Sequence, residues 1–598
     1  MAGFYMPQRQ MPTVKDFDSP HTISIINEIA YDWDDSTSIP FASSFLPSFF
    51  EAFRHHLSTA NIPSDDDYNT DLPLIRACFT AFAKGVPDLY GEEHGTTKLW
   101  KDILSMTDTI LSWTRYFFRS FDISISIEES PDIGGIPDKN LSCIAPLLST
   151  LIQNEWFRFT LYSEPHFIEN VARFWLHLTL RGYQSAYEMR ALMATLTSFD
   201  ERIEEMSEIV RSRYEIEDVA TVVMQGIIEA QSRQPQKYID YARSGKLLAF
   251  CTLVSDDIFN CLVARKSIMW SCRAIRTLVS KPKRYSPSEA RIRMVGLQHL
   301  LGIVSAHSQS YVYNFTEALD FHLLESVLMV NHFISLNKGS LGAGMTPPMT
   351  FDVLVRVLDG AATLSVYRSV LRQILRAVKH AKKFKSTRGQ ERVVQSWYRL
   401  KALALEREKD MHRYDVEENN GRFLCENQEC PNKRNTSRTS SRRCGGCLNV
   451  MYCSPECQKI DWKAIPGHRL SCLENQLRRK DGKSYGISRI DLEFCFAKCR
   501  DDIRAHLNLI RALRTQDLNE QAEKPDPVAT TIVMSYCGPG NGVRMLRKDI
   551  STCAALVGED KWLSAKKAGE DVIIVMEIPS AGDQSHYAFP LSESGITL

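Results

Sequence analysis

The sequence predicts a mainly α-helical protein, built from a large helical array, a short cysteine-rich module and a small α+β region near the C-terminal end. Three observations support this fold class. Apolar residues recur at intervals of three and four through residues 41–415, which places them on one face of a helix. Between Cys425 and Cys472, cysteine and histidine occur in four closely spaced pairs. Beyond residue 530, β-branched runs replace the helical spacing.

Composition places the 598-residue chain among ordinary globular proteins, with 44% hydrophobic and 24% charged residues. Its length exceeds what a single core can organise, so we expect several domains. Basic and acidic residues number 72 each. The resulting net charge of zero provides no global field that would draw the chain to nucleic acid or to a membrane. We find no signal-peptide pattern and no long apolar run, so we expect no membrane span.

Nine of the sixteen cysteines lie outside the cysteine-rich module, mostly in apolar surroundings. Scattered cysteines of this kind are typical of small buried hydrophobic residues in a reducing compartment. We therefore expect an intracellular protein, located in the nucleus or the cytoplasm. The nine are Cys78, Cys143, Cys251, Cys261, Cys272, Cys495, Cys499, Cys537 and Cys553.

The first 415 residues divide into two parts. Residues 1–40 carry proline, serine and aspartate without lasting periodicity, which predicts a loose N-terminal arm. Residues 41–415 are expected to form one all-helical domain, with apolar stripes such as those at 171–178 and 353–358. We find no fixed repeat period. An armadillo- or HEAT-like solenoid and an irregular bundle therefore both stay open.

Helix starts are marked at two places. Ser286–Glu289 has the pattern of a capping box, with Pro287 at the first helical position. Thr350 is expected to be a second N-cap, because it precedes another apolar helical stretch. These signals support the helical assignment independently of the apolar spacing.

The end of the helical region, residues 368–392, is rich in lysine and arginine. The simpler interpretation is the solvated face of one or two helices. The alternative is a nuclear-import or nucleic-acid patch centred on residues 379–385. No aromatic stacking platform accompanies this patch, so we do not expect direct nucleic-acid binding.

Residues 485–598 are expected to form a helix followed by a small α+β region. Apolar residues between 492 and 510 fall on one helical face, and they include Cys495 and Cys499. We assign these two cysteines to the helix core, since no nearby histidine or cysteine completes a metal site. Three strands are then predicted, with a helix at 546–556 between the first two. The strands are Thr530–Tyr536, Asp571–Ile578 and Tyr587–Leu591.

The cysteine-rich module, residues 423–473, is the part of the chain with readable chemistry. Cysteines two to four residues apart can approach one ion from a tight turn, and a histidine one helical turn before a cysteine can do the same. Zinc takes four such ligands in a closed structural site, so eight ligands fit two sites. Spacing alone leaves sequential and cross-braced pairing open. The pairs are Cys425 with Cys430, Cys444 with Cys447, Cys453 with Cys457, and His468 with Cys472.

Residues between the pairs carry a family resemblance. The sequence shows Cys444-Gly-Gly-Cys447, then Tyr452-Cys453-Ser-Pro-Glu-Cys457-Gln458, then Asp461-Trp462 and His468-x3-Cys472. This pattern resembles the MYND-type zinc finger, and the resemblance is confined to residues 425–472. It implies two structural zinc ions in a cross-brace. One ion would be held by Cys425, Cys430, Cys453 and Cys457, and the other by Cys444, Cys447, His468 and Cys472.

The resemblance also implies a protein-interaction module for proline-rich segments of the Pro-x-Leu-x-Pro kind. Gln458 and Trp462 match the positions that line its groove, and an exposed aromatic beside an amide suits an extended ligand. Two departures bear on specificity. The first cysteine pair is spaced by four residues where two is usual, and the spacer 431–443 is longer than usual and basic. The alternative is a finger that only clips the fold together, with Trp462 in its core.

The enzymatic alternative is a SET-type protein lysine methyltransferase, since some MYND fingers lie inside such enzymes. These enzymes need an Asn-His-x-Cys-like stretch and a downstream tyrosine motif, and we find neither after Cys472. The glycine-rich residues 537–542 lack a full cofactor fingerprint and are typical of a turn. We therefore expect a non-enzymatic interaction scaffold or regulatory protein.

Overall fold

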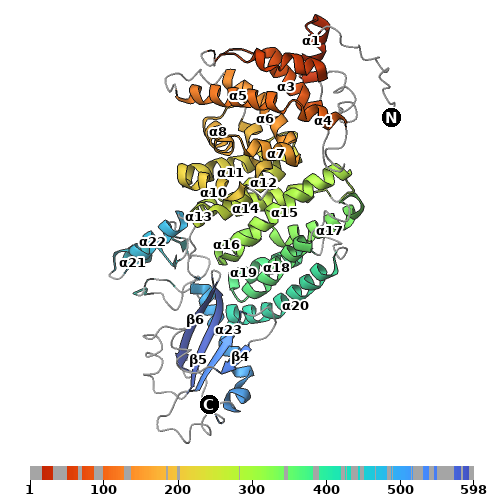
Figure 1. Cartoon of the computed structure of the whole chain (residues 1–598). Helices are drawn as coiled ribbons and strands as arrows, with labels where there is room; N and C mark the ends of the chain where they lie inside the picture. The colour runs from red at the N-terminus through yellow and green to blue at the C-terminus, as the bar shows by residue number, and fades with distance from the viewer. Residues whose placement is uncertain are drawn as a thin grey trace, which may run out of the picture. The chain divides into compact units, whose positions relative to one another are not determined.

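The computed structural model confirms the predicted fold class: a helical array, a small Cys/His module and a C-terminal helix with a small sheet (Figure 1). The structure describes most of residues 17–590. Within 17–590, apart from single residues and pairs, the ranges that are not described are 31–49, 86–97, 127–135, 198–201, 342–347, 382–389, 419–424, 432–441, 481–486, 516–529, 538–543 and 548–571.

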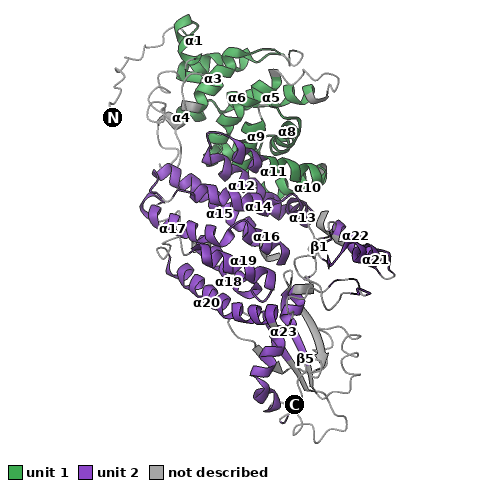
Figure 2. Cartoon of the chain, turned by 180° about the vertical axis from the view of Figure 1, so that it is seen from behind, with its two compact units in different colours: residues 1–225 green, residues 226–598 purple. Residues whose placement is uncertain are grey.

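The chain divides into two compact units, residues 1–225 and residues 226–598 (Figure 2). This boundary falls inside the range 41–415, for which we expect a single helical domain. In unit 1 the helices include α1 (Pro20–Asn27), α3 (Pro73–Gly85), α4 (Lys98–Leu104), α5 (Thr107–Ser126), α6 (Ile136–Leu151), α7 (Glu155–Tyr162), α8 (Phe167–Arg181), α9 (Ala186–Leu196), α10 (Ile203–Arg213) and the start of α11 (Ile216–Ser232), with a short 3-10 turn η2 (Thr59–Asn61).

The core of unit 1 is aromatic. Trp113 of α5 lies edge-on to Phe79 of α3 at a centroid separation of 6.1 Å, and its indole nitrogen donates to the carbonyl oxygen of Leu57 at 2.7 Å. In α8 the predicted stripe is buried, including Phe174 and Trp175 with no exposed surface. Each of these large buried rings adds a large apolar area to the packing of these helices.

Residues 17–27 depart from the loose arm that we predict. They include helix α1, which begins at Pro20 and buries Ile26. The Ser19 hydroxyl accepts a hydrogen bond from the backbone nitrogen of Thr22 at 3.2 Å. Serine and proline, taken as signs of a loose chain, here act as N-cap and first helical residue.

Unit 2 is also built mainly of helices. Each helix packs mainly on helices one to three positions along the chain, and α15 contacts α12, α14, α16, α17 and α18. The helices are α12 (Tyr238–Val254), α13 (Asp256–Ala264), α14 (Ser267–Val279), α15 (Pro287–Ser310), α16 (Val312–Asp320), α17 (Leu323–Leu341), α18 (Pro348–Leu364), α19 (Arg368–Ala381) and α20 (Glu391–Arg413), followed by a π turn η4 (Tyr414–Glu418).

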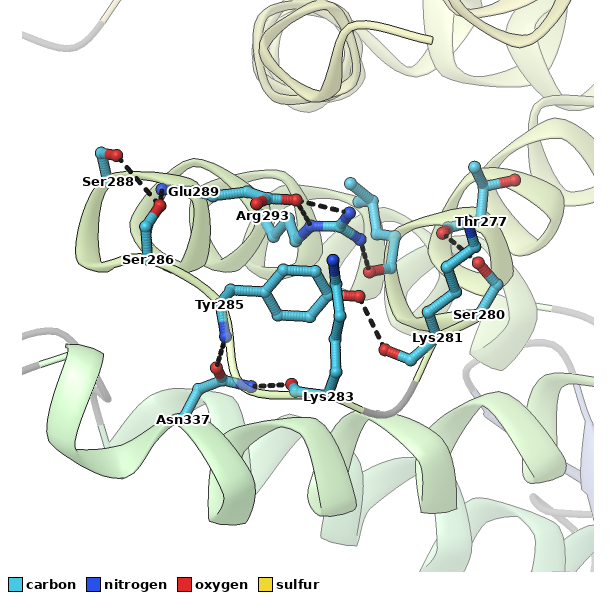
Figure 3. A network of polar contacts seen from close by, with 11 residues as sticks. Thr277, Ser280, Lys281, Lys283, Tyr285, Ser286, Ser288, Glu289, Arg293 and Asn337 are labelled. Carbon is cyan, nitrogen blue, oxygen red and sulfur yellow. Dashed lines mark hydrogen bonds and ion pairs between the residues drawn. The ribbon is translucent and has the colours of Figure 1, made fainter. Parts of the chain in front are cut away.

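The loop from α14 to α15 shows how one predicted helix start forms (Figure 3). Ser286 caps α15, since its hydroxyl accepts from the backbone nitrogen of Glu289 at 3.3 Å. The Glu289 carboxylate does not complete a capping box; it accepts from buried Arg293 at 2.8 Å, one turn along. Arg293 lies between the rings of Tyr238 and Tyr285, 3.5 and 4.1 Å from their centroids. The buried guanidinium is thus paired and stacked.

The second predicted N-cap is wrong. Helix α18 begins at Pro348, so Thr350 lies inside its first turn, where it is buried and its hydroxyl accepts from the Gln298 side chain at 3.5 Å. Pro348 at the first helical position is the better start signal, because proline lacks the N–H that a helix leaves unpaired there.

The basic segment is only partly described. Arg368 is not on a solvated face: it is buried and forms a two-point ion pair with Asp415, at 2.9 Å for both bonds. Arg376 and Lys379 are exposed on α19, in agreement with the simpler interpretation. Residues 382–389, which include most of the import patch centred on 379–385, lie outside the described residues.

The C-terminal region packs on the array of unit 2 through α23 (Arg489–Ala505). The Asp491 carboxylate caps α19 by accepting from the backbone and the hydroxyl of Ser369, at 2.7 and 2.9 Å. Cys495 and Cys499 are fully buried on α23. Tyr367, at the start of α19, donates to the carbonyl oxygen of Pro579 in the sheet. One short stretch of the array therefore holds both parts of this region.

The small sheet has the order β4-β3-β5-β6, with β3 and β5 parallel and the other pairs antiparallel. The three predicted strands are present, and a fourth was missed. The predicted helix 546–556 is wrong at its start, since Leu546 lies in β4 paired with Val533, and residues 548–556 lie outside the described residues. The strands are β3 (Thr530–Ser535), β4 (Arg544–Arg547), β5 (Val572–Ser580) and β6 (Asp583–Pro590).

Two further features concern the whole described chain. None of its helices is long and apolar enough to cross a membrane. No disulfide joins cysteines among the described residues.

Candidate metal centre

Two short strands and two helices carry the cysteine-rich module. Strand β1 (Arg442–Arg443) pairs antiparallel with β2 (Met451–Tyr452), and Cys444 and Cys453 directly follow them. Helix α21 (Pro455–Lys463) begins after Ser454, whose hydroxyl accepts from the backbone nitrogen of Cys457 at 3.2 Å. Serine at the N-cap and proline at the first helical position fix where this helix starts, and thereby place Cys457.

Helix α22 (His468–Lys480) follows a tight corner at Gly467. A Cβ atom at this position would lie 2.3 Å from the carbonyl oxygen of Ala464 and 2.4 Å from that of Asp461. Only glycine fits so close an approach. The corner turns the chain so that His468 and Cys472, one turn apart, face the same side of α22.

The eight predicted residues come together in two groups of four, in which the ligand atoms lie within 4.8 Å of one another. Pairs one and three form the first group, and pairs two and four form the second, which is the cross-braced arrangement. All eight residues are buried except Cys453, which is half-buried. The groups are Cys425, Cys430, Cys453 and Cys457, and Cys444, Cys447, His468 and Cys472.

Distances between the donor atoms fit a tetrahedral ion. The sulfurs of Cys430 and Cys453 are 3.6 Å apart, and those of Cys444 and Cys472 are 3.7 Å apart. Two sulfurs bonded to one tetrahedral zinc at about 2.3 Å lie about 3.8 Å apart, whereas a disulfide brings them to about 2.05 Å. Four soft sulfur and nitrogen donors at these separations suit zinc, and no position is left for water.

His468 is oriented for metal binding. Its Nε2 atom lies 3.3 Å from the sulfur of Cys447, and its Nδ1 atom lies 3.2 Å from the hydroxyl of Ser471. The same hydroxyl donates to the His468 carbonyl oxygen at 3.0 Å, so it accepts the proton of Nδ1. That hydrogen bond leaves the lone pair of Nε2 free for an ion.

Burial is the main cause of the pKa shifts of three donors, His468, Cys472 and Cys453. It lowers the pKa of His468, against the opposing effect of Asp461, which favours the neutral imidazole that a metal requires. It raises the pKa of Cys472 to about 11, and it also raises the pKa of Cys453. Thiols with raised pKa carry protons at neutral pH, so zinc uptake must release those protons.

The family comparison agrees with this geometry. The model of the MYND finger family matches residues 425–472. This segment is a MYND finger. No curated protein and no solved structure matches the chain. The match therefore places 425–472 in a family of zinc-binding interaction modules.

The two predicted peptide-contact residues lie on one face of α21 in the MYND finger. Gln458 and Trp462 are one helical turn apart, and both are half-buried. The Trp462 ring lies edge-on to His468 at a centroid separation of 6.0 Å, and it packs against the buried cysteines. Trp462 thus contributes one side to the core of the finger and leaves part of its surface accessible.

Several supporting residues were missed by sequence reasoning. The Gln476 amide donates to the sulfur of Cys472 at 3.2 Å. The carbonyl oxygen of Asn427 accepts from the backbone nitrogen of Cys430 at 3.1 Å and so shapes the wide first pair. The Tyr452 hydroxyl donates to the carboxylate of Asp461 at 2.6 Å. Tyr452 and Asp461 had a signal, as parts of the family pattern.

Two other expectations concern neighbouring residues. Most of the basic spacer, residues 432–441, lies outside the described residues. Cys495 and Cys499 belong to no metal cluster among the residues that the structure describes. The sulfur of Cys495 donates instead to the carbonyl oxygen of Val366 at 3.5 Å.

Proposed function

We propose that this protein is a non-enzymatic interaction scaffold or regulatory protein, whose MYND finger holds two structural zinc ions and binds proline-rich segments of the Pro-x-Leu-x-Pro kind. The observation that carries the proposal is the accessible face of α21, where Gln458 and Trp462 lie side by side on a helix anchored by Cys457. An aromatic surface beside an amide suits an extended proline-rich chain, which has unpaired backbone carbonyls.

The zinc ions act on structure in this proposal. Each group of donors closes a tetrahedral shell, so neither ion has a position for substrate. The carboxyl-terminal half of α21 is held through Trp462 against His468 of the second group, and its start is held through Cys457 of the first. Both ions thus fix the helix that presents the peptide-contact face.

Binding is tested by titrating a fluorescent Pro-x-Leu-x-Pro peptide with the full-length protein. We expect a dissociation constant on the order of micromolar or weaker, because a short extended ligand buries little surface and loses entropy on ordering. Gln458→Ala should weaken binding several-fold with zinc content unchanged. Ile460→Ala is the matched control: this side chain is 45% exposed on the same helix, about 200° around from Gln458.

Trp462→Ala is a less clean variant, because the ring also packs against His468. We expect it to weaken both peptide binding and the second zinc site, so zinc content must be measured beside affinity. The alternative function is a structural clip, and the contact of Trp462 with the finger core favours it. Equal peptide affinity of the parent and Gln458→Ala would support the clip and overturn the peptide groove.

The absence of catalysis is also part of the proposal. We infer that the chain transfers no methyl group to lysine, because the SET-type stretches are missing from its sequence after Cys472. Incubation with labelled S-adenosylmethionine and a panel of histones and peptides tests this. Methyl transfer that is lost on substitution of a residue in the C-terminal region would contradict the proposal. We further propose an intracellular site of action, which the lack of disulfides among the described residues supports.

A further inference from the structure

A cluster of two histidines and a glutamate lies in unit 2, outside the finger sequence. It begins at the corner between α16 and α17. His322 immediately precedes α17 and has a left-handed backbone, with φ of 63°. Its Nδ1 atom lies 3.3 Å from a carboxylate oxygen of Glu325, which is buried in the first turn of α17. A left-handed residue with a bulky side chain is uncommon and costs energy, so something must hold it there.

The same pairing of a left-handed histidine with a glutamate three residues on occurs in unit 1, where it provides a control. His166 precedes α8 with φ of 59°, and its Nδ1 atom lies 3.0 Å from Glu169, again three residues on. No third metal-binding side chain joins that pair among the residues that the structure describes. A histidine and a glutamate in this arrangement are therefore sufficient to cap a helix, and they do not by themselves indicate a metal site.

His380, in the last turn of α19, distinguishes the second cluster from the first. Its Nδ1 atom lies 3.4 Å from the same carboxylate oxygen of Glu325. Its ring lies roughly parallel to that of His322, with centroids 6.1 Å apart. The three donor atoms all lie within 4.8 Å of one another. Helices α17 and α19 are thus joined by three convergent ligands, 58 residues apart in sequence at the widest.

The separations match the requirements of an ion. Ligands bonded to tetrahedral zinc at about 2.0–2.1 Å lie about 3.3–3.4 Å from one another, and both distances to the Glu325 oxygen have these values. The donor set of two imidazoles and one carboxylate is one that zinc and related ions accept. The charge also fits, because a divalent cation would compensate a buried carboxylate.

We propose that His322, Glu325 and His380 form a third metal site, which binds one zinc or similar divalent transition-metal ion and links the start of α17 to the end of α19. The shell has three protein ligands, so a fourth position remains open. The side chains of His322 and His380 are 42% and 54% exposed, which lets water or a ligand from a partner reach the ion. In this respect the site differs from the two closed shells of the finger.

A second cluster, Asp18 with His55 and His56 in unit 1, is the weaker candidate. Asp18 is 72% exposed, its two carboxylate oxygens face different histidines at 3.4 and 3.9 Å, and one nitrogen of His56 already bonds the carbonyl oxygen of Phe17 at 2.9 Å. It can still take up zinc at high concentration. The test below therefore rests on the difference between variants of one site.

The test is equilibrium dialysis of the full-length protein, with its finger zinc retained, against buffers of rising free zinc, followed by elemental analysis. The parent should bind one more zinc per chain than His380→Ala. That side chain is exposed near a helix end, so its removal leaves the fold intact. His322→Asn should lose the same ion, because it removes one imidazole ligand. Asparagine tolerates the left-handed backbone, so the corner should keep its shape. The double variant should lose no more than either single one.

Two controls and a structural measurement complete the test. His166→Asn and Lys379→Ala should retain the third ion, because the first changes a cap without a third ligand and the second changes an exposed neighbour of His380. Added zinc should slow amide exchange at residues 376–381 in the parent and not in His380→Ala. The proposal is overturned if the parent and His380→Ala bind equal zinc at every concentration, or if His166→Asn loses the same ion.

Discussion

The helical units and the MYND finger are ordered by different forces. In the array, large apolar side chains such as Trp175, Phe174 and Leu354 are completely buried. Among the described residues of the finger, the buried cluster consists of cysteines and Tyr452, with Val450, Cys453 and Trp462 packed against it. A module with so little aliphatic area cannot offset its chain entropy by burial alone. The comparison teaches that metal takes the place of a hydrophobic core in the finger.

The largest effect is expected for Cys453→Ser. Structural zinc sites contribute ~10 kcal/mol or more to the folding of small fingers, so loss of one ligand in four should release one ion and loosen residues 425–472. Elemental analysis of protein purified without added zinc should show the finger zinc falling from two ions per chain to one. Circular dichroism should still show the helical signal of the array. A parent protein with one zinc or none would contradict the assignment.

The counterpart in the array is Trp175→Ala. This ring is fully buried in α8, so its removal should destabilise unit 1 by about 3–5 kcal/mol through lost burial and a cavity. Thermal unfolding followed by circular dichroism measures the loss. Zinc content should stay at the parental value, because all eight finger ligands lie in unit 2. Release of finger zinc in this variant would mean that the two regions fold as one.

Much of this difference between a metal-bound finger and helices with apolar cores could be predicted from the sequence. The eight finger ligands lie within 48 residues, and their spacing and neighbours are local signals. The buried stripe of α8 was likewise readable, because a periodicity of three and four is local. Helix α1 was missed because serine and proline serve both as loop residues and as helix starts.

Features that depend on tertiary contact were not predicted. Strand β4 forms because Val533 and its neighbours in β3 pair with it. The sequence of residues 544–547 alone has no pattern that predicts a strand. His322 and His380 are 58 residues apart, so only the packing of α17 against α19 brings them together. The same limitation applies to Asp491, which caps α19 from a helix more than one hundred residues along the chain.

Acid should lower the stability of unit 2, because His307 is buried there with a lowered pKa. Burial lowers the pKa of His307 to about 3, whereas an unfolded chain binds the proton at about 6.5. Because the unfolded state is protonated first, this contribution to stability is present above pH 6.5 and is lost as the pH falls toward 3. The loss should approach ~1.4 kcal/mol per pH unit.

Urea unfolding of unit 2 at pH 7, 6, 5 and 4 measures this slope. His307 lies between the hydroxyls of Ser267 and Thr252, at 2.9 and 3.3 Å, and edge-on to Phe259. His307→Gln keeps a polar side chain in this place and cannot titrate in this range. Its slope should be shallower than that of the parent, and an unchanged slope would show that other groups cause the acid sensitivity.

The smallest effect is expected for Cys495→Ser, the same substitution as in the finger but made in helix α23. Cys495 is fully buried and its sulfur donates to the carbonyl oxygen of Val366. A serine hydroxyl can replace that donor, so we expect a loss of about 1 kcal/mol in unfolding free energy and no change in zinc content. A zinc stoichiometry that depends on Cys495 would show that the finger ligands are wrongly assigned.

The most direct test of the central claim is amide hydrogen exchange of the full-length protein before and after treatment with a strong zinc chelator. Metal supplies the folding free energy of the finger, so amides in α21 and the first turns of α22 should lose protection when zinc is removed. Amides of α8 and α15, which belong to apolar cores, should remain protected. Persistent protection of α21 without zinc, or loss of protection in α8 and α15 together with it, would contradict the claim.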